Sequence, residues 1–447
     1  MYVEVPPPIA PPGSPEGSKR LVKVLGSPPD PRSSERYLHW HKLRRLKPPE
    51  GLSSEDWWWR IKVLERGPGM RRLDLLDKSG EPFGYGLPDL LLRSLHHVDQ
   101  ECSGRVAMDE VVTSDRQAGQ RFLVNSLMEE AIRSSQLEGA TTSRVVAKEM
   151  LRSGREPKDR SERMIVNNYR AMQFMRNEMG KTLSPESVLE LHRILTEGTL
   201  DDPTAAGRLQ VPGEDRVAVF DRDDGRRVHL PPPAEELPDR LRRMCEFANE
   251  GTASKQFIHP VVRAILLHFC LAYDHPFVDG NGRTARILFS WSMREQGYWL
   301  VEYLSVSKIL REAPAQYGRA FLETETDEGD TTYFLIYQLN VIERAIREMH
   351  DYLARKIGEV KEIEELLHGA GGFNHRQLAL LSDALHHPGR SYSLRQHADT
   401  HRVTHETARS DLTRLVERSL LRRRRVGREY VFEPAADLSK RLKESPT

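Results

Sequence analysis

The stretch that decides the fold is His275-Pro276-Phe277-Val278-Asp279-Gly280-Asn281-Gly282-Arg283-Thr284-Ala285-Arg286. It is polar and turn-rich, and it lies between two apolar stretches, residues 261–273 before it and residues 287–291 after it. Drawn as helices, both flanking stretches are apolar on nearly every face, which is typical of buried helices. Connections usually run over the surface, so a polar loop held between two buried helices indicates a functional site.

The residue types in this loop suit the binding of a phosphate group. Gly280 and Gly282 allow the backbone to approach an anion closely, and the helix that follows offers unpaired N–H groups at its N-terminus. Arg283 and Arg286 are three residues apart at the start of that helix, so both side chains reach the same anion. The pattern predicts an anion site at this helix start.

Two further side chains give the loop a chemistry. Asp279 would repel a phosphate beside it unless it holds Mg²⁺, a cation that prefers oxygen ligands. His275 titrates near neutrality and is suited to take a proton from an attacking hydroxyl. The alternative is a capped helix–loop–helix with a surface histidine and solvated arginines, and it leaves the coincidence of these roles in one loop unexplained.

The stretch resembles the signature of the Fic family, H-P-F-x-x-G-N-G-R-x-x-R, and matches it at every defined position. The resemblance implies a mainly α protein, a Fic-type helical bundle with a β-hairpin flap, that transfers AMP from ATP to a Ser, Thr or Tyr hydroxyl of a target protein. It implies that His275 deprotonates the hydroxyl and that Asp279 holds Mg²⁺ or Mn²⁺. Positioning and charge neutralisation carry most of such a reaction. The residues implied to bind the phosphates are Gly280, Asn281, Gly282, Arg283 and Arg286.

A short stretch far upstream, Ser134-Ser135-Gln136-Leu137-Glu138-Gly139, has the pattern of a helix end. Gly139 supplies the left-handed residue of the cap, and a glutamate at this end of the helix dipole indicates a cationic partner. The stretch also resembles the inhibitory motif of the Fic family, [Ser/Thr]-x-x-x-Glu-[Gly/Asn], with Ser134, Glu138 and Gly139 at its defined positions. This resemblance implies that Glu138 pairs with Arg286 in place of a γ-phosphate, and that the isolated protein is autoinhibited.

Residues 217–230 predict a β-hairpin around Asp-Gly, stopped by three prolines at 231–233. Most such hairpins are plain surface features. The resemblance implies instead a flap that aligns the backbone of the target by strand addition. We interpret His229 in this hairpin as structural. The docking residues of the flap are expected to be Val217, Val219, Val228 and Leu230.

Composition divides the chain into four parts. Residues 1–33 are rich in Pro, Gly and Ser and predict a disordered or extended arm. Residues 34–110 predict an N-terminal domain with two short strands within 73–85, and its tryptophans 57–59 are expected to pack rather than to stack on a ligand. Residues 111–368 carry successive helical patterns and are assigned to the Fic domain with its inhibitory helix.

The last part, residues 369–447, has another pattern. Three predicted helices, the third over about 404–419, precede two strands around Gly427, and this order resembles a winged helix. DNA binding and a role in protein contacts or dimer packing remain alternatives, because four consecutive arginines suit phosphate contact but nothing indicates base readout. The residues expected to contact DNA are Arg409, Arg414, Arg423 and Arg425.

Overall composition restricts the remaining classes. Lys and Arg number 67 against 66 Asp and Glu, so any basic patch must be local. Three cysteines are too few, and odd in number, for a disulfide framework. The sequence has no apolar run of eighteen residues and no apolar leader, which together predict a cytoplasmic protein that does not enter a membrane.

Three alternatives to AMP transfer stay open. The first is a Fic-fold transferase with another donor, since the loop does not identify the base of the nucleotide. The second is the reverse reaction, hydrolytic removal of AMP with Glu138 orienting water. The third is a winged-helix DNA-binding regulator in which the Fic domain senses nucleotide. The expected partners are an unidentified target protein, the chain itself through auto-modification, and a second copy in a homodimer.

Overall fold

The computed structural model describes residues 3–27, 36–66, 69–103, 116–220, 225–251, 256–369, 372–387, 389–426 and 429–444. The chain forms two compact units, Met1–Arg347 and Glu348–Thr447. Helices dominate both, so the protein is mainly α, as its sequence predicts. Within the described residues, none of the helices combines the length and the apolar character that spanning a bilayer requires.

The first unit consists of helices with two small antiparallel sheets. Its helices are α1 (Pro15–Leu25), α3 (Trp40–Leu43), α4 (Ser54–Glu65), α5 (Asp89–Ser103), α7 (Arg116–Leu137), α8 (Arg144–Ser153), α9 (Arg160–Asn177), α10 (Pro185–Thr196), α11 (Leu237–Asn249), α12 (Pro260–Asp274), α13 (Asn281–Glu295), α14 (Val306–Glu312), α15 (Pro314–Thr326) and the first part of α16 (Thr332–Gly369). Short 3-10 turns are η1 (Pro203–Ala205), η2 (Ala234–Glu236) and η3 (Trp299–Tyr303). Strand β1 (Arg71–Leu76) pairs with β2 (Pro82–Tyr85), and β3 (Val219–Phe220) pairs with β4 (Arg227–His229). Both predicted hairpins are therefore present.

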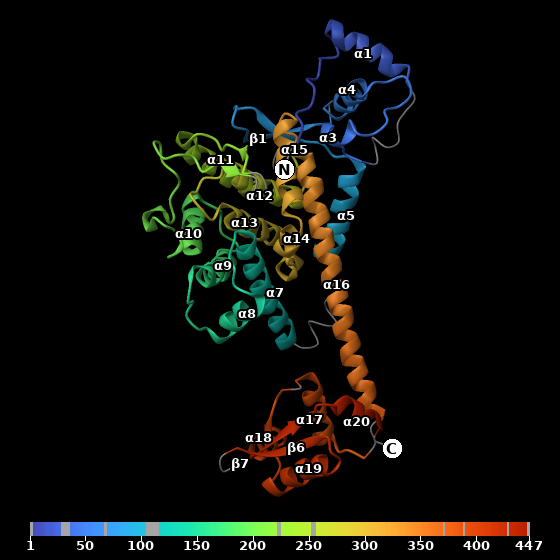
Figure 1. Ribbon diagram of the computed structural model, residues 1–447, viewed down its shortest axis with the longest axis vertical. Coiled ribbons are helices and arrows are strands. Elements are labelled where there is room, and N and C mark those ends of the chain that lie inside the picture. Colours follow the sequence, from blue (N-terminus) through green and yellow to red (C-terminus); the bar gives the residue numbers. More distant parts are fainter. Residues whose placement is uncertain are drawn as a thin grey trace. The chain divides into compact units, whose positions relative to one another are not determined.

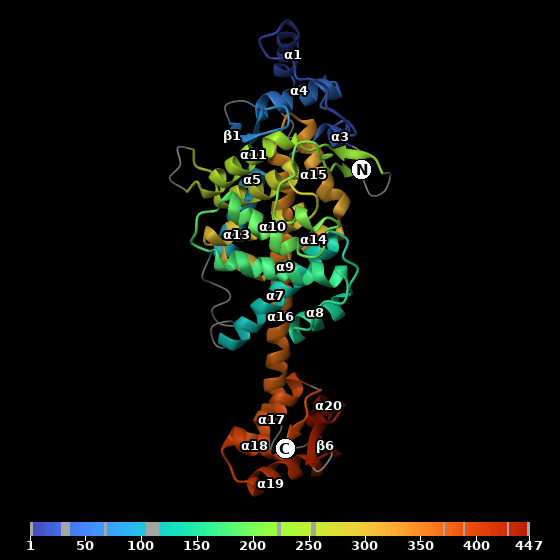
Figure 2. The ribbon, with the colours of Figure 1, turned by 90° about the vertical axis from the view of Figure 1, so that its left-hand side faces the viewer.

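Helices α12 and α13 lie in the middle of the first unit (Figure 1). Helix α12 is buried at every position from Val261 to Leu271, as its all-round apolar pattern predicts. Figure 1 places α9, α10 and α11 on one side of this pair and α14, α15 and α16 on the other, and α9 and α10 face the viewer in Figure 2. The loop between α12 and α13 is thus held by packed helices rather than left on a free surface.

The N-terminal residues contain a helix that their composition did not predict. The expectation of a disordered or extended arm over residues 1–33 is wrong for Pro15–Leu25, which forms α1. The side chain of Ser14 accepts a hydrogen bond from the backbone N–H of Gly17, and proline at the first helical position suits a helix start. Tryptophans 57–59 are almost fully buried, so they serve packing as predicted.

A buried cluster of charges joins α4 to the connection between α15 and α16. The Nζ atom of Lys62 lies 2.7 Å from Oδ2 of Asp327 and 3.2 Å from Oδ2 of Asp330, and the lysine is completely buried. Strand β2 adds a backbone bridge, because Gly84 N donates to Gly329 O at 3.1 Å. These contacts make the N-terminal residues part of the same compact unit as the central helices.

The second unit contains the predicted succession of three helices and a hairpin. Its core includes Leu381, Leu412, Leu415 and Phe432. The structure adds two elements that were not predicted, a two-residue strand and a terminal helix. A strand of two residues is too short to show the alternation of apolar and polar residues by which a strand is recognised in a sequence. Strand β7 is central in an antiparallel sheet, with β5 and β6 on either side. After the end of α16, the elements are α17 (His375–His386), β5 (Tyr392–Ser393), α18 (Leu394–His401), α19 (His405–Glu417), β6 (Leu421–Val426), β7 (Glu429–Pro434) and α20 (Leu438–Glu444).

Candidate functional site

The loop between α12 and α13 is shaped by left-handed residues and by one amide side chain. His275 ends α12 at φ 45°, ψ 54°, and Gly280 precedes α13 at φ 86°, where a Cβ would lie 3.1 Å from Cγ2 of Thr196. Asn281 accepts from the backbone N–H of Phe277 at 2.9 Å and donates to the carbonyl of the same residue at 2.8 Å. The side chain of Asn281, which was expected to cradle phosphate, is therefore committed to closing the loop, and anion contact is left to the backbone and the arginines.

The imidazole of His275 is oriented as a proton acceptor. Its Nδ1 lies 3.2 Å from the carbonyl oxygen of Ala272. A carbonyl only accepts, so Nδ1 carries the hydrogen and Nε2 keeps a lone pair. Burial lowers the pKa of His275 to about 4, against the opposing effect of the hydrogen bond to Ala272. The ring is therefore neutral near pH 7 and ready to take a proton at Nε2.

Arg283 is a buried cation whose hydrogen-bond donors are not used. The residue is fully buried, and its Nε, Nη1 and Nη2 atoms find no hydrogen-bond partner among the described residues. It forms an ion pair with Asp279, whose Oδ2 lies 3.3 Å from Nη2. Buried guanidinium groups normally engage their donors, so this one is suited to an anion that offers several oxygens.

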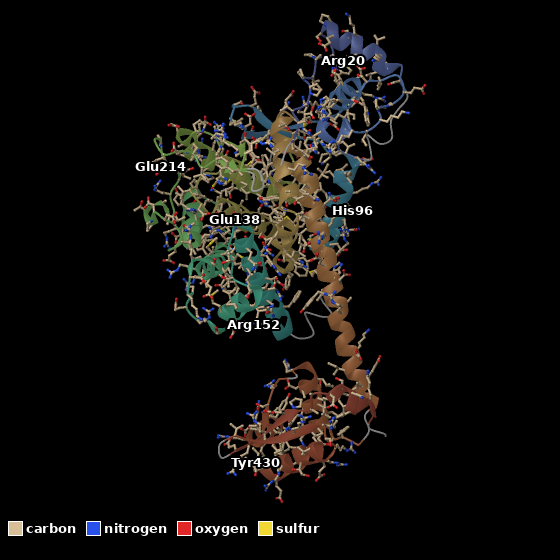
Figure 3. The ribbon with its side chains drawn as sticks, viewed as in Figure 1. Arg20, His96, Glu138, Arg152, Glu214 and Tyr430 are labelled. Carbon is tan, nitrogen blue, oxygen red and sulfur yellow. The ribbon has the colours of Figure 1, made fainter. Side chains whose placement is uncertain are left out.

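Arg286 is already engaged by the upstream stretch. Its Nε donates to Oγ of Ser134 at 2.9 Å, and its Nη2 donates to the carbonyl of Ser134 at 3.1 Å and to Oε1 of Glu138 at 2.8 Å. Gly139 has φ 103°, the left-handed value expected of the cap. Glu138 follows the last residue of α7 and lies beside α13 (Figure 3). The pairing of Glu138 with Arg286 that the resemblance implies is present.

The carboxylate of Glu138 also fills the space above Gly282. A Cβ built on this glycine would lie 2.2 Å from Oε1 of Glu138 and 2.9 Å from Nη1 of Arg286. Gly282 is thus the residue that lets a negatively charged group reach the start of α13, and in this structure that group is the carboxylate.

Part of this set opens into a cavity of about 310 Å³, whose lining does not include Asp279 or Arg283. His275, Gly282 and Arg286 line it on the side of the motif, and Glu138 lines it at the end of α7. Helix α15 forms another wall through residues that include Tyr317 and Glu325. The hairpin lines it with Val219, Phe220, Val228 and His229.

The structure brings only part of the predicted flap to the site. Val219 and Val228 line the cavity, whereas Leu230 is exposed and lines a separate surface hollow, and Val217 lies before the first strand of the hairpin. The predicted Asp-Gly turn falls largely on residues 221–224, which lie outside the described residues. Gly225 is the first described residue after them. The arginines expected to contact DNA all belong to the second compact unit.

His192 is a site residue that sequence reasoning missed. It lies on α10 and is fully buried, with its ring stacked on Phe277 at 3.8 Å between centroids. Gly207 N donates to its Nδ1 at 3.0 Å, so its Nε2 carries the hydrogen and donates to the carbonyl of Asp279 at 2.9 Å. The signal was a histidine on the inner face of a helix otherwise lined by Val188, Leu191 and Leu195.

Two further supports of the loop were missed. Arg216, just before β3, donates through Nη2 to the carbonyls of Asp274 and His275 at 2.7 and 3.1 Å. Behind Arg286, Nε2 of His268 lies 2.8 Å from the hydroxyl of Tyr317, which lines the cavity. These contacts join segments that are far apart in the chain, so no local sequence pattern predicts them.

Four histidines of the first unit share one electrostatic property. Burial lowers the pKa of each: to about 2 for His39, about 3 for His268, and about 4 for His192 and His275. All four are therefore neutral in the folded chain near pH 7.

The residues present fit a magnesium ion that is shared with a phosphate. Within the described residues, no group of three or more His, Cys, Asp or Glu side chains is arranged to hold a metal by itself. Asp279 offers one carboxylate, with 38 % of its side chain exposed, directly beside the free donors of Arg283. Mg²⁺ usually takes one or two carboxylates and completes its shell with water and substrate phosphates, so a single aspartate beside an anion site suits it.

Comparison with known proteins identifies the same region. A model described as Fic/DOC family matches residues 182–293, from just before α10 into the last turn of α13. "Protein adenylyltransferase fic-1" of Caenorhabditis elegans is 25% identical over 242 residues, 53% of this chain and 44% of that protein. "Protein adenylyltransferase Fic" of Drosophila virilis is 34% identical over 113 residues, 25% of this chain and 20% of that protein. The chain thus spans less than half the length of these curated relatives.

A solved structure agrees in fold. A Fic family protein from Desulfovibrio desulfuricans G20 superimposes with a TM-score of 0.55 at 18% identity, covering 79% of this chain and 98% of that one. At this identity the likeness concerns the fold alone. It extends well beyond the twelve-residue loop, into the helices that hold it.

Proposed function

We propose that this chain, which carries a Fic/DOC family domain, is a protein adenylyltransferase that transfers AMP from ATP to a hydroxyl side chain of a target protein. One observation supports it above the others. Arg283 is a buried guanidinium in the first turn of α13, and within the described residues it has an ion pair with Asp279 at 3.3 Å but no hydrogen bond. It follows His275, whose ring is neutral near pH 7 and keeps a lone pair at Nε2. An anion that reacts beside a general base accounts for both features.

In the proposed reaction, Nε2 of His275 takes the proton of the target hydroxyl. The hydroxyl oxygen then attacks the α-phosphorus of ATP in line, the bond to the bridging oxygen breaks, and pyrophosphate leaves. Arg283 and Arg286 bind the β- and γ-phosphates, and the N–H groups at the start of α13 add to this contact. Mg²⁺, held by Asp279, would supply charge neutralisation for the phosphates when bound.

The position of Glu138 supports autoinhibition. Its carboxylate holds the same guanidinium that the γ-phosphate needs, and it lies over Gly282, where a phosphate would approach the backbone. A carboxylate and a phosphate repel each other and cannot share this donor. ATP then binds in an orientation that does not present its α-phosphate to the target hydroxyl.

Label transfer tests the proposal. The protein is incubated with α-labelled ATP and Mg²⁺ as wild type, as Glu138→Gly and as Glu138→Gly with His275→Ala. We expect weak labelling of the wild type, strong labelling of Glu138→Gly, and no labelling once His275 is replaced. Labelling that persists in the variant with His275→Ala would refute the proposed role of His275 as the base. Parallel reactions with labelled GTP, CTP and UTP identify the base, and release of AMP from the labelled product by the wild type identifies the reverse reaction.

A second activity, DNA contact by the second unit, has a separate observation in its favour. Every residue of β6 after Leu421 is exposed, and β6 is an edge strand of its sheet. It presents Arg423 and Arg425, while Arg409 and Arg414 are exposed on α19. Cations on one strand and one helix suit the phosphates of a duplex.

Gel-shift titration at several salt concentrations tests this second proposal. Affinity should fall steeply with salt, and Arg423→Ala together with Arg425→Ala should reduce the salt slope by about 2, since each phosphate contact contributes about 0.9. An affinity for DNA that does not change with salt concentration, or a salt slope that the double substitution leaves unchanged, would show that these arginines do not bind phosphates.

A further inference from the structure

The flap needs support from outside its own ladder. Among the described residues, strands β3 and β4 pair over two register positions, Val219 with His229 and Phe220 with Arg227. A two-stranded hairpin is marginally stable in water by itself. A surface that aligns a target by strand addition must nevertheless keep a fixed register. The contacts between the hairpin and the helices around the cavity therefore decide how well the flap is held.

His229 makes these contacts through both ring nitrogens. It is buried on β4, with Nε2 2.7 Å from the carbonyl oxygen of Tyr273 on α12 and Nδ1 2.8 Å from Oε1 of Glu325 on α15. The carbonyl only accepts, so Nε2 carries a hydrogen. Nδ1 lies within ion-pair distance of Oε1 but forms no hydrogen bond within the described residues. One side chain thus joins the hairpin to two helices.

Glu325 is the point where several segments meet. Besides His229, its carboxylate lies 3.3 Å from Nζ of Lys78, in the turn between β1 and β2. The backbone N–H of Lys78 in turn donates to the hydroxyl of Tyr273 at 3.1 Å. Both His229 and Glu325 also line the cavity that contains His275.

We propose that His229 and Glu325 are positioning residues that fix strand β4 against α12 and α15, and thereby set the register in which a target segment presents its hydroxyl to His275. This inference rests on the proposed adenylyltransfer for its functional part. The residues just before β3 are held independently, through Arg216 on the carbonyls of Asp274 and His275. The pair of His229 and Glu325 accordingly holds the β4 side of the hairpin.

Substitution of Glu325 separates the contact from the charge. Glu325→Ala removes the partner of Nδ1. Glu325→Gln keeps it, because the amide of glutamine donates to Nδ1 of a neutral histidine while Nε2 still donates to Tyr273. Glu246→Ala is the matched control, since it removes an exposed carboxylate on α11 that pairs with Arg242. His229→Ala is a second variant that tests the same contact from the other side.

Hydrogen–deuterium exchange over residues 217–230 measures the flap itself. We expect at least tenfold faster exchange in Glu325→Ala and His229→Ala, and exchange within twofold of wild type in Glu325→Gln and the control. Equal exchange in all variants would overturn the inference. This measurement needs neither ATP nor a target, so it stands whether or not the chain transfers AMP.

A transfer assay then measures positioning. Each substitution is placed in the Glu138→Gly background, with the full-length His275→Ala chain as the acceptor of labelled AMP. We expect Glu325→Ala to raise the KM for this acceptor at least tenfold and the KM for ATP less than threefold, with rescue by Glu325→Gln. Faster hydrogen–deuterium exchange in Glu325→Ala together with an unchanged KM for the acceptor would reject the positioning role. No transfer by the Glu138→Gly parent would instead reject the proposed function, and the exchange data would still decide whether the pair holds the flap.

Discussion

Removal of the Glu138 carboxylate should tighten the binding of ATP. Arg286 is only 3% exposed at its side chain, and Glu138 is 27% exposed, so their contact at 2.8 Å is more than a solvated surface pair. ATP must displace the carboxylate before its γ-phosphate reaches the guanidinium. In Glu138→Gly this competition disappears, while Arg286 keeps its hydrogen bonds to the hydroxyl and carbonyl of Ser134 and so stays in place.

The size of the effect follows from the contact that is lost. A hydrogen bond between charged groups contributes about 1.5–3 kcal/mol, and each 1.4 kcal/mol is about a factor of ten. The dissociation constant for ATP should therefore fall about 10- to 150-fold in Glu138→Gly. Glu138→Gln keeps a hydrogen-bond acceptor but loses the charge, so its affinity should lie between those of wild type and Glu138→Gly.

Isothermal titration with a non-hydrolysable ATP analogue and Mg²⁺ measures these affinities without turnover. Glu129→Gln is the matched control, because Glu129 also lies on α7 but pairs with Arg133 and Arg144. Affinity for ATP in Glu138→Gly within threefold of wild type would refute the reasoning, since the carboxylate would then not compete with the γ-phosphate. A gain in the Glu129→Gln control would show that the effect belongs to α7 in general.

Three further predictions concern stability. His192→Leu leaves the carbonyl of Asp279 and the N–H of Gly207 without this partner and should lower the free energy of unfolding by about 2–6 kcal/mol in urea titrations, at about 1–3 kcal/mol for each of the two groups. Lys62→Met removes the buried cation that pairs with Asp327 and Asp330 and should lower the free energy of unfolding by about 3–5 kcal/mol, whereas an unchanged stability in denaturant titrations would contradict the buried ion pair. Histidines whose pKa is lowered by burial, among them His192 and His275, titrate near pH 6.5 when unfolded and at about 4 or lower when folded, so the unfolded chain binds more protons between these values. The melting temperature should accordingly fall from pH 7 to pH 5, and a constant value would argue against neutral histidines in the folded state.

The motif loop was readable because its chemistry is local. Twelve consecutive residues hold the base, the turn and both arginines, and the apolar stretches on either side predicted the two buried helices. The pairing of Glu138 with Arg286 was readable only through the family resemblance, since 148 residues separate them. In the N-terminal residues, proline content suggested an extended arm, but the cap at Ser14 places Pro15 at the first helical position, where a helix accepts proline.

The sequence by itself therefore determined the helical class and the motif with the residue types it holds, since periodicity and spacing along the chain encode them directly. Tertiary structure alone decided which groups support them. His192 holds the loop from α10, Glu325 holds the hairpin from α15, and Asn281 serves the shape of the loop instead of the phosphate. Each of these roles depends on hydrogen-bond partners that only packing brings together, and burial, which sets the protonation of His275, is likewise a property of the folded chain.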